Sequence, residues 1–541
     1  MAVTSAPHTV DVVVVGAGFA GMYMLHRLRS LGLTARAFET GADVGGTWYW
    51  NRYPGARCDT ESMQYSYAFS NELQQEWSWS QHYAPQPEIL RYAQHVADRF
   101  DLKRDITFNT KVTAAHFDEA THRWTIRTDG GEAISARYCV MATGCLSSAR
   151  KPNLPGQESF TGQTYHTGQW PHTEVNFTGQ RVAVIGTGSS GIQSIPVIAE
   201  QAAHLTVFQR TPNYSIPCRN RPMVEDYEQN WKSNYPERRL QQKHSRVGIV
   251  YNANDISALE VSDAERQAEY EKRWKSGGTS FIAAYNDLFF NKAANDTAAQ
   301  FVREQIRATV KNPDIAERLI PTDYPIGTKR LCADTNYFET YNRDNVSLVD
   351  IRHNPIEALT PTGLRAGGTE YEFDAIVFAT GYDAVTGALA AIDIRGRDNQ
   401  ALKEKWEAGP RTYLGVMSAG FPNLFMITGP GSPSVLSNMI ISIEQHVEWI
   451  GDCLAHLGSR QQDCIEATQD AEDNWVQHVN EIAYRTLFPM ANSWYMGANI
   501  PGKPRVFLPY IGGVGSYRQT CADIAAKGYE GFQILAPAAA E

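Results

Sequence analysis

Two glycine triplets of equal spacing are the residues of this sequence best suited to binding chemistry. They follow apolar runs at 11–15 and 181–185, and consist of Gly16, Gly18 and Gly21 and of Gly186, Gly188 and Gly191. The first glycine permits a tight turn, the second lets a pyrophosphate approach the backbone, and the third lets a helix pack closely on a strand. Each triplet therefore predicts a dinucleotide-binding site.

The residue at the end of the following strand distinguishes the two sites. Glu39 follows the run 34–38 and lies 23 positions after Gly16, where a carboxylate can accept from ribose hydroxyls. Arg210 lies 24 positions after Gly186. An acid would repel a 2′-phosphate whereas a guanidinium pairs with it, so the second site should hold NADPH and the first FAD. A solvated strand-end charge is the alternative reading of Arg210.

The elements that must position these residues are two strand–turn–helix–strand units. Apolar segments at 138–144 and 376–383 add strands that end in small-residue turns. Such turns let the chain pass close to a cofactor, although ordinary buried parallel strands would look the same. The pattern predicts an α/β fold of two interleaved dinucleotide-binding, Rossmann-like domains.

Two further stretches have helical character. Residues 221–319 are charged, periodic and poor in glycine, which indicates a helical insertion. A second helix is predicted after the turn at 429–433, from the periodic residues Leu436, Met439, Ile440, Ile443, Val447 and Ile450. Its N-terminus would aim at the flavin, or it is simply a core helix.

The composition is that of an ordinary globular enzyme. The 541 residues suggest roughly three or four folding units. A net charge of -10 disfavours nucleic-acid binding, and the eight scattered cysteines form no metal-like cluster. No apolar run reaches membrane length. We expect a cytoplasmic protein with reduced thiols, no metal and no membrane partner.

Two longer motifs carry a family resemblance. The segment FTGQTYHTGQWP at 160–171 resembles the signature of Baeyer–Villiger monooxygenases, which are class B flavoprotein monooxygenases, and GGTWYWNRYPGARCD at 45–59 matches a second family pattern. The segments at 327–330, 429–434 and 493–505 look most like those of phenylacetone, steroid and cyclohexanone monooxygenases. The resemblance covers nearly the whole chain.

The resemblance implies domain limits and cofactor contacts. It implies an FAD domain at 1–150 and 385–541, an NADPH domain at 151–220 and 320–384, and a helical insertion at 221–319. Besides the first glycine turn, the implied FAD contacts are Glu39, Gly46, Thr47, Trp48, Tyr49, Trp50, Asp59, Tyr65, Val112 and Met439. The implied NADP contacts, besides the second turn, are Arg57, Asp59, Ser189, Ser190, Gln193, Arg210, Thr211, Lys329 and Trp494.

The implied activity is conversion of a ketone to an ester or lactone with O2, through a peroxide formed on the flavin. Arg330 would stabilise the peroxide anion and the oxyanion of the adduct, because a guanidinium stays charged. Asp59 would orient Arg330. Without the resemblance, Lys329 and Arg330 would be interpreted as a surface pair. His166 is expected to make structural hydrogen bonds rather than act as a base.

The implied substrate pocket favours a hydrophobic ketone, although packed core residues would have the same composition. Its residues are Thr60, Cys145, Leu146, Leu331, Ser434, Val435, Leu436, Met439 and Tyr495. Relatives often carry glutamine at the position of Cys145, so their substrate range need not transfer. The alternatives are a flavin-containing N- or S-monooxygenase, a disulfide reductase, for which Cys139 and Cys145 lack the paired spacing, and a flavin-binding sensor. The oligomeric state is left open.

Overall fold

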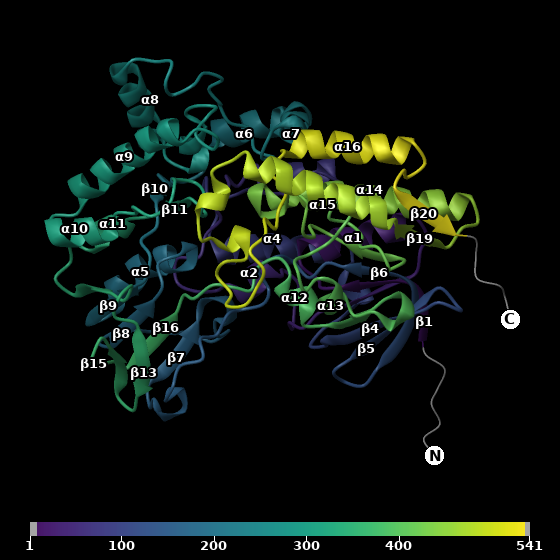
Figure 1. The fold of residues 1–541 in the computed structure, drawn as a ribbon, viewed down its shortest axis with the longest axis horizontal. Helices are drawn as coiled ribbons and strands as arrows, with labels where there is room; N and C mark the ends of the chain where they lie inside the picture. The colour runs from purple at the N-terminus through teal and green to yellow at the C-terminus, as the bar shows by residue number, and fades with distance from the viewer. Residues whose placement is uncertain (1–7, 536–541) are drawn as a thin grey trace.

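The computed structural model describes residues 8–535, and two β-sheets organise it (Figure 1). The first sheet has the order β17-β4-β5-β6-β1-β2-β3, with β18 beside β6. Its strands are β1 (His8–Val15), β2 (Ala35–Phe38), β3 (Ile106–Thr107), β4 (Val112–Asp118), β5 (Arg123–Thr128), β6 (Ala133–Met141), β17 (Asp393–Arg395) and β18 (Leu424–Met426). Residues 12–15 of the parallel strand β1 are four consecutive valines because neighbouring chain covers both faces of the strand there.

The second sheet is parallel throughout and has the order β12-β9-β8-β16-β7. Its strands are β7 (Gln163–His166), β8 (Arg181–Ile185), β9 (His204–Gln209), β12 (Val346–Asp350) and β16 (Ala375–Phe378). An antiparallel sheet lies beside it, made of β13 (Ile356–Thr360), β14 (Gly363–Ala366) and β15 (Thr369–Glu372). Two strand pairs complete the list: β10 (Ser215–Pro217) with β11 (Cys332–Asp334), and β19 (Cys464–Ala467) with β20 (Phe532–Leu535).

The two sheets are interleaved along the chain. After β6 the chain leaves the first sheet and builds the second, and then returns, because β17 pairs with β4 and β18 pairs with β6. The prediction of an α/β fold with two interleaved dinucleotide-binding domains is confirmed. The domain limits stay predictions.

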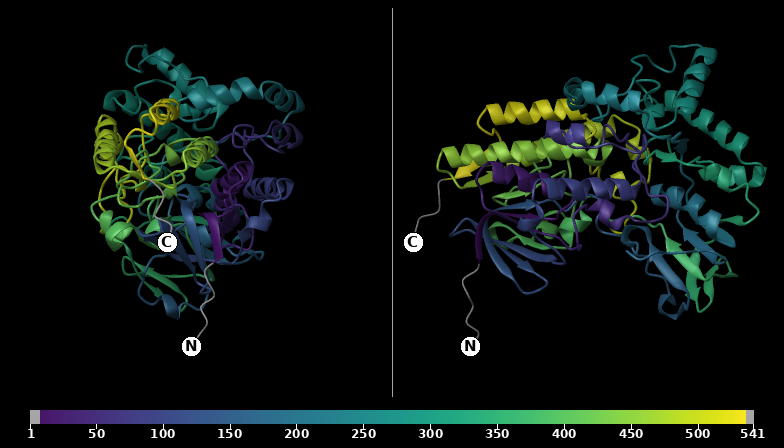
Figure 2. Two further views of the ribbon diagram at one scale, coloured as in Figure 1. Left: turned by 90° about the vertical axis from the view of Figure 1, so that its right-hand side faces the viewer. Right: turned by 180° about the vertical axis from the view of Figure 1, so that it is seen from behind.

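Helices cover both sheets. In the view from behind, α1 (Phe19–Ser30), α14 (Met439–Ser459) and α16 (Val514–Ala526) lie one above another over the first sheet (Figure 2). The second glycine turn opens α5 (Ser189–Gln201). The other helices are α2 (Thr47–Trp50), α3 (Asn71–Glu76), α4 (Gln86–Arg99), α11 (Tyr337–Thr340), α12 (Gly387–Ala390), α13 (Leu402–Lys405) and α15 (Gln469–Tyr484).

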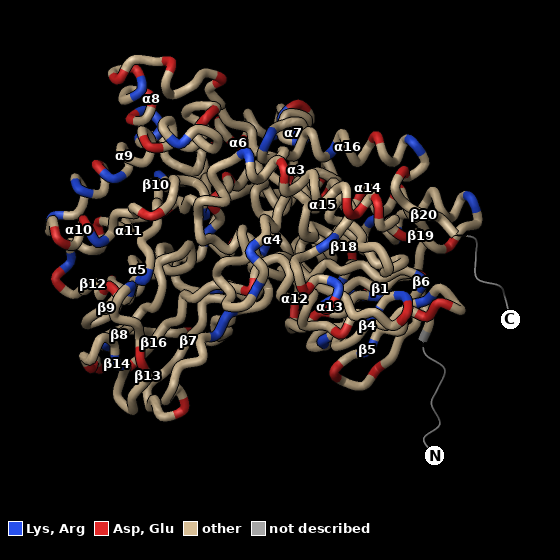
Figure 3. Tube along the Cα trace, viewed as in Figure 1, with Lys and Arg blue, Asp and Glu red and all other residues tan. Residues whose placement is uncertain are grey.

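The stretch 221–319 is helical, as its composition predicts. It holds α6 (Glu225–Ser233), α7 (Tyr235–His244), α8 (Asp263–Ser276), α9 (Lys292–Thr309) and α10 (Pro313–Leu319). Charged residues are frequent on α8, α9 and α10, whereas the strands of the second sheet carry few (Figure 3). Within residues 8–535, no helix has both the length and the apolarity to cross a membrane.

The helix after the 429–433 turn begins later than predicted. Leu436 belongs to a separate short helix, η6 (Ser434–Leu436), and α14 starts only at Met439. Ser437 is extended, and the side chain of Asn438 accepts a hydrogen bond from the N–H of Ile440. This cap sets the start of α14 and leaves Leu436 outside it.

Candidate functional site

Both glycine turns are crossed at close range by another part of the chain. A Cβ on Gly16 would lie 2.6 Å from the carbonyl oxygen of Ala142, and one on Gly186 would lie 2.5 Å from that of Ala379. Both glycines have a positive φ, at 104° and 110°. The small-residue turns after β6 and β16 are the crossing segments, so only glycine fits at either position.

The third glycine of each triplet lets the helix approach its strand. A Cβ on Gly21 would lie 1.9 Å from the oxygen of Gly16, and the same approach occurs at Gly191. Neither α1 nor α5 has a side chain capping its first N–H groups. Those groups and the positive end of each helix suit a pyrophosphate, so the residues present fit the two predicted dinucleotides.

Glu39 closes the predicted FAD turn. Its buried carboxylate accepts from the N–H of Ala17 at 2.8 Å and of Gly41 at 2.7 Å. Each oxygen keeps a lone pair that can accept from a ribose hydroxyl. The N–H of Thr110 donates to the Glu39 carbonyl at 2.9 Å, which brings the start of β4, and with it Val112, to this end of the site.

The 45–59 motif packs directly on this turn. A Cβ on Gly46 would lie 2.9 Å from the Cα of Gly18. Thr47, Trp48, Tyr49 and Trp50 form α2, and the indole N–H of Trp48 donates to the hydroxyl of Tyr65 at 3.2 Å. The predicted FAD residues of the N-terminal segment therefore gather around one glycine turn. Met439 is the first residue of α14.

Cations gather at the predicted NADPH site. Burial, and then the charges of Arg210 and Arg352, lower the pKa of Lys329 to about 8. Its ammonium lies 4.5 Å from the centre of the Tyr324 ring. The Arg352 Nε donates to the carbonyl of Arg210 at 3.4 Å, and Thr211 is held through its carbonyl by the Thr187 hydroxyl at 2.9 Å.

Sequence reasoning missed Arg352. It lies two residues after the end of β12, whereas Arg210 lies directly after β9, and these strands are neighbours in register, with Asp350 opposite Gln209. The sequence does show an arginine shortly after the apolar segment 346–350. Only the sheet order shows that this strand adjoins β9.

Two of the predicted NADP contacts, Gln193 and Arg57, also join the two domains. The Gln193 Nε2 donates to the carbonyl of Arg57 at 3.0 Å, and the hydroxyl of Tyr53 donates to Gln193 Oε1 at 2.8 Å. The two serines contact residues of their own domain: the hydroxyl of Ser189 lies 3.1 Å from the sulfur of Cys332, and that of Ser190 lies 3.0 Å from the Thr167 hydroxyl. Gln193 thus has an interdomain contact that its place in the glycine fingerprint does not reveal.

His166 makes the structural hydrogen bonds expected of it. Its Nδ1 accepts from the N–H of Gly168 at 3.0 Å. Its Nε2 therefore carries the proton, and donates to the carbonyl of Arg150 at 3.1 Å. Gly168 belongs to the 160–171 motif, and Arg150 lies at the predicted boundary between the two domains.

Asp59 and Arg330 form a bidentate ion pair across 271 positions of sequence. The Arg330 Nε lies 3.0 Å from Asp59 Oδ2, and Nη2 lies 2.6 Å from Oδ1 and 2.7 Å from Oδ2. The charge of Asp59 raises the pKa of Arg330 well above its usual value. The guanidinium therefore stays charged at every working pH, although 33% of the side chain is exposed.

The remaining donor of Arg330 points to the predicted substrate residues. Its Nη1 donates to the carbonyl of Val435 at 3.3 Å. Burial raises the pKa of Tyr495, and the charge of Arg330 acts against that rise, so the two side chains are neighbours. Tyr495 and Trp494 share η8 (Trp494–Met496), with ring centres 4.2 Å apart.

Cys145 contacts the segment 428–435, which also carries the Val435 carbonyl that accepts from Arg330. Its sulfur lies 3.0 Å from the hydroxyl of Ser434 and 3.3 Å from the carbonyl of Thr428. Burial raises the pKa of the thiol, so it stays protonated and donates. Other predicted substrate residues are buried or partly buried in the protein's cores: Thr60, Leu146, Leu331, Val435, Leu436 and Met439.

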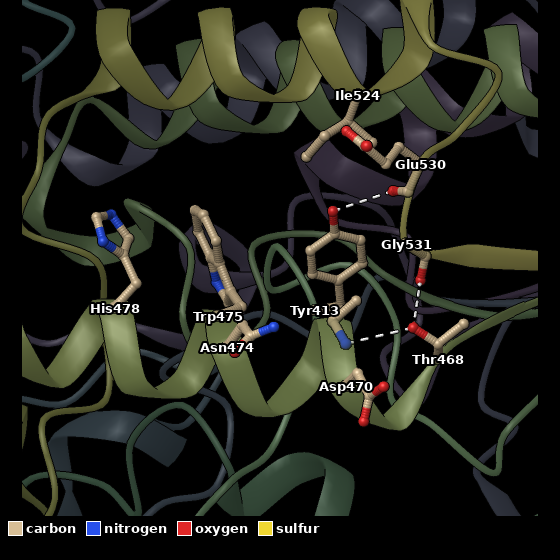
Figure 4. A pocket seen from close by; sticks show the side chains of 10 residues that line it. Tyr413, Thr468, Asp470, Asn474, Trp475, His478, Ile524, Glu530 and Gly531 are labelled. Carbon is tan, nitrogen blue, oxygen red and sulfur yellow. Dashed lines mark hydrogen bonds between the residues drawn. The ribbon is translucent and has the colours of Figure 1, made fainter.

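A surface hollow of about 410 Å³ lies elsewhere on the molecule (Figure 4). Its lining includes Tyr413, Trp475 and His478, and none of the predicted cofactor or substrate residues. This hollow and the site at Arg330 are therefore separate features.

A family model described as pyridine nucleotide-disulphide oxidoreductase matches residues 13–284. All eight cysteines of the chain lie within residues 8–535, and each of them is buried and unpaired in the structure. The pyridine nucleotide in this description agrees with the dinucleotide predicted at the second glycine turn.

Full-length relatives are monooxygenases. An acetone monooxygenase (methyl acetate-forming) of Gordonia sp. (strain TY-5) is 42% identical, covering 97% of this chain and 99% of its own. A Baeyer-Villiger monooxygenase of Pseudooceanicola batsensis is 43% identical, covering 96% and 95%. A phenazine N-monooxygenase of Lysobacter antibioticus is 44% identical, covering 96% of both chains.

Solved structures match over the same length. An oxidized steroid monooxygenase bound to NADP has a TM-score of 0.94 and 55% identity, covering 97% of this chain and 99% of its own. A structure named OTEMO, in complex with FAD and NADP, has a TM-score of 0.95 and 40% identity, covering 98% and 100%.

Proposed function

The chain belongs to the family of Baeyer–Villiger monooxygenases, and we propose that Arg330 and Asp59 are the pair on which its oxygen insertion depends. The protein is an FAD- and NADPH-dependent monooxygenase that converts ketones to esters or lactones with O2. The observation that carries the proposal is the position of Arg330, which is held by Asp59 on one side and reaches the Val435 carbonyl on the other.

Bound flavin, once reduced by NADPH, supplies one oxygen atom of O2 in activated form. Arg330 provides the fixed positive charge next to the reacting carbonyl. Negative charge develops on oxygen during the attack, and a donor that already points at it needs no reorganisation. The guanidinium suits this role because Asp59 keeps it protonated.

Asp59 acts as a positioning residue. Its two oxygens occupy Nε and Nη2 of Arg330, which fixes the plane of the guanidinium and leaves Nη1 directed at the turn that carries Ser434 and Val435. Both oxygens of this carboxylate are engaged by the guanidinium. The carboxylate therefore takes no proton from the substrate.

Arg210 and Lys329 select NADPH over NADH. Burial, and then the charge of Arg210, lowers the pKa of Lys329, and a 2′-phosphate bound beside these two cations would relieve their repulsion. Arg352, near the same point, adds a third charge.

The substrate is a hydrophobic ketone. Cys145, Leu146, Ser434, Val435, Leu436 and Tyr495 line its pocket, and apart from the hydroxyl and thiol groups their side chains are apolar. We also assign the protein to the cytoplasm, on its composition and its reduced cysteines.

The test is to mix the purified flavoprotein with NADPH, air and a panel of acetone, cyclohexanone, phenylacetone and a steroid ketone. A product heavier than its ketone by one oxygen, identified as an ester, supports the proposal. Consumption of NADPH without any oxygenated product from the panel would contradict it.

Oxygenation of nitrogen is the second candidate, because the phenazine N-monooxygenase is as similar to this chain as the ketone-oxidising relatives are. Phenazine therefore belongs in the panel. An N-oxide formed faster than every ester would favour this candidate.

A further inference from the structure

The turn that meets Arg330 has a strained backbone. Thr428 and Ser434 are not glycines, yet their φ values are 55° and 43°. Residues with side chains adopt this left-handed conformation only when surrounding contacts hold them there. The turn leads directly to Val435, whose carbonyl accepts from Arg330.

Thr428 is held on both of its backbone polar groups. The thiol of Cys145 lies 3.3 Å from its carbonyl oxygen, and its N–H donates to Nδ1 of His446 at 2.8 Å. His446 lies on α14 and is fully buried. His446 is not among the predicted functional residues.

A hydroxyl on a third element fixes the imidazole. The hydroxyl of Tyr517, on α16, donates to the carbonyl of Leu414 at 2.5 Å and lies 2.7 Å from His446 Nε2. The Tyr517 hydroxyl has only one proton, which it donates to the Leu414 carbonyl. His446 Nε2 must therefore carry a proton and donate it to the Tyr517 oxygen. The lone pair is thereby left on Nδ1, where Thr428 needs it.

The charge state agrees with this tautomer. Burial lowers the pKa of His446 to about 3, so the ring is neutral throughout the range in which the protein works. Leu414 also has a left-handed backbone, with φ of 57°. One hydrogen-bonded chain thus joins two strained positions through α14 and α16.

We propose that His446, oriented by Tyr517, is a positioning residue that holds the 428–435 turn and so keeps the Val435 carbonyl on Arg330. The inference rests on the proposed function, because it assumes that Arg330 serves oxygen transfer. It assigns a catalytic consequence to a side chain that contacts neither Arg330 nor any predicted cofactor residue.

The same helix pair supplies a matched control. The indole N–H of Trp449, one turn after His446 on α14, donates to the carbonyl of Cys521 on α16 at 3.1 Å. Trp449→Phe therefore removes a buried hydrogen bond between the same two helices without touching the turn. If His446 merely stabilises the packing of α14 on α16, both changes should act alike.

The experiment compares His446→Leu, His446→Asn, Tyr517→Phe and Trp449→Phe as purified flavoproteins. For each, the rate of flavin reduction by NADPH without oxygen is measured, and then the amount of ester formed per NADPH in air. His446→Leu leaves the Thr428 N–H without its acceptor, so ester per NADPH should fall roughly tenfold while flavin reduction is preserved. In His446→Asn the side-chain oxygen takes the place of Nδ1 as the acceptor for the Thr428 N–H. This variant should therefore recover most of the lost ester per NADPH.

Tyr517→Phe keeps the proposal testable if His446→Leu fails to fold. Tyr517→Phe should also lower the amount of ester formed per NADPH, whereas Trp449→Phe should give the same amount as the wild type. Equal coupling in Tyr517→Phe and Trp449→Phe would overturn the inference, as would an asparagine variant no better than leucine. A wild type that makes no ester from any ketone would instead be a failure of the proposed function.

Discussion

Replacing Arg330 with alanine should separate the use of NADPH from the use of oxygen. The change removes three short contacts to Asp59, at 2.6, 2.7 and 3.0 Å, and one of 3.3 Å to the Val435 carbonyl. None of these contacts involves the Glu39 turn or the α5 turn. Retention of FAD and bleaching of the flavin by NADPH should therefore persist.

Oxygen transfer should then fail. A preorganised donor at a developing oxyanion is worth ~10²–10³-fold in rate, and Arg330 supplies a full charge as well. Arg330→Lys should rescue little, because an ammonium cannot hold both Asp59 oxygens and the Val435 carbonyl in one plane. Asp59→Asn should give a smaller loss, since the cation remains but its orientation loosens.

The assay is rapid-mixing absorbance for flavin reduction, followed by product analysis under air. The double variant Asp59→Asn, Arg330→Ala should be no slower than Arg330→Ala alone, because the two residues act as one unit. An Arg330→Ala protein that makes ester at near the wild-type rate would refute the reasoning, and so would equal losses in both halves of the cycle.

Four further outcomes are expected. Arg210→Ala should reduce kcat/KM for NADPH on the order of ten- to a hundredfold and change that for NADH much less, and equal losses would refute the assignment. Binding of NADPH should weaken as pH rises through about 8, because Lys329 loses its proton there, and titrations with Lys329→Met should lack this step. Gly21→Ala should yield colourless, poorly folded protein, since a Cβ would lie 1.9 Å from a backbone oxygen, whereas Gly458→Ala, with open space around it, should stay yellow. Burial raises the pKa of Glu444 from 4.5 to about 7, so the folded protein favours the protonated carboxyl. The resulting stabilisation is complete below pH 4.5 and is lost as the pH rises through 7. In thermal unfolding, Glu444→Gln should therefore raise Tm by a few degrees at pH 8 and hardly at pH 5.

Much of the binding chemistry could be predicted because it is local in sequence. A glycine triplet between a strand and a helix is a contiguous pattern, and the residue at the next strand end lies only 23 or 24 positions away. The proposed catalytic pair is different, because Asp59 and Arg330 lie 271 positions apart and no spacing rule connects them. Only the family resemblance brought them together before the structure did.

The start of α14 shows what hydrophobic periodicity cannot predict. Leu436 has the spacing of the helix behind it, but the Asn438 cap interrupts the backbone between them. Periodicity reports which side chains face the core. It does not report where backbone hydrogen bonds begin, because a cap residue decides that locally.

The sequence by itself determined the two dinucleotide units, the acid or cation at each strand end and the helical insertion, because each depends on neighbours in the chain. Only the tertiary structure decided that Arg352 lies near Lys329, that the Val435 carbonyl meets Arg330, and that His446 holds Thr428. Those contacts arise from the order of strands in a sheet and from the packing of distant helices. Many sequences would satisfy the same local patterns, and the contacts exist only after the first and last thirds of the chain have closed into one sheet.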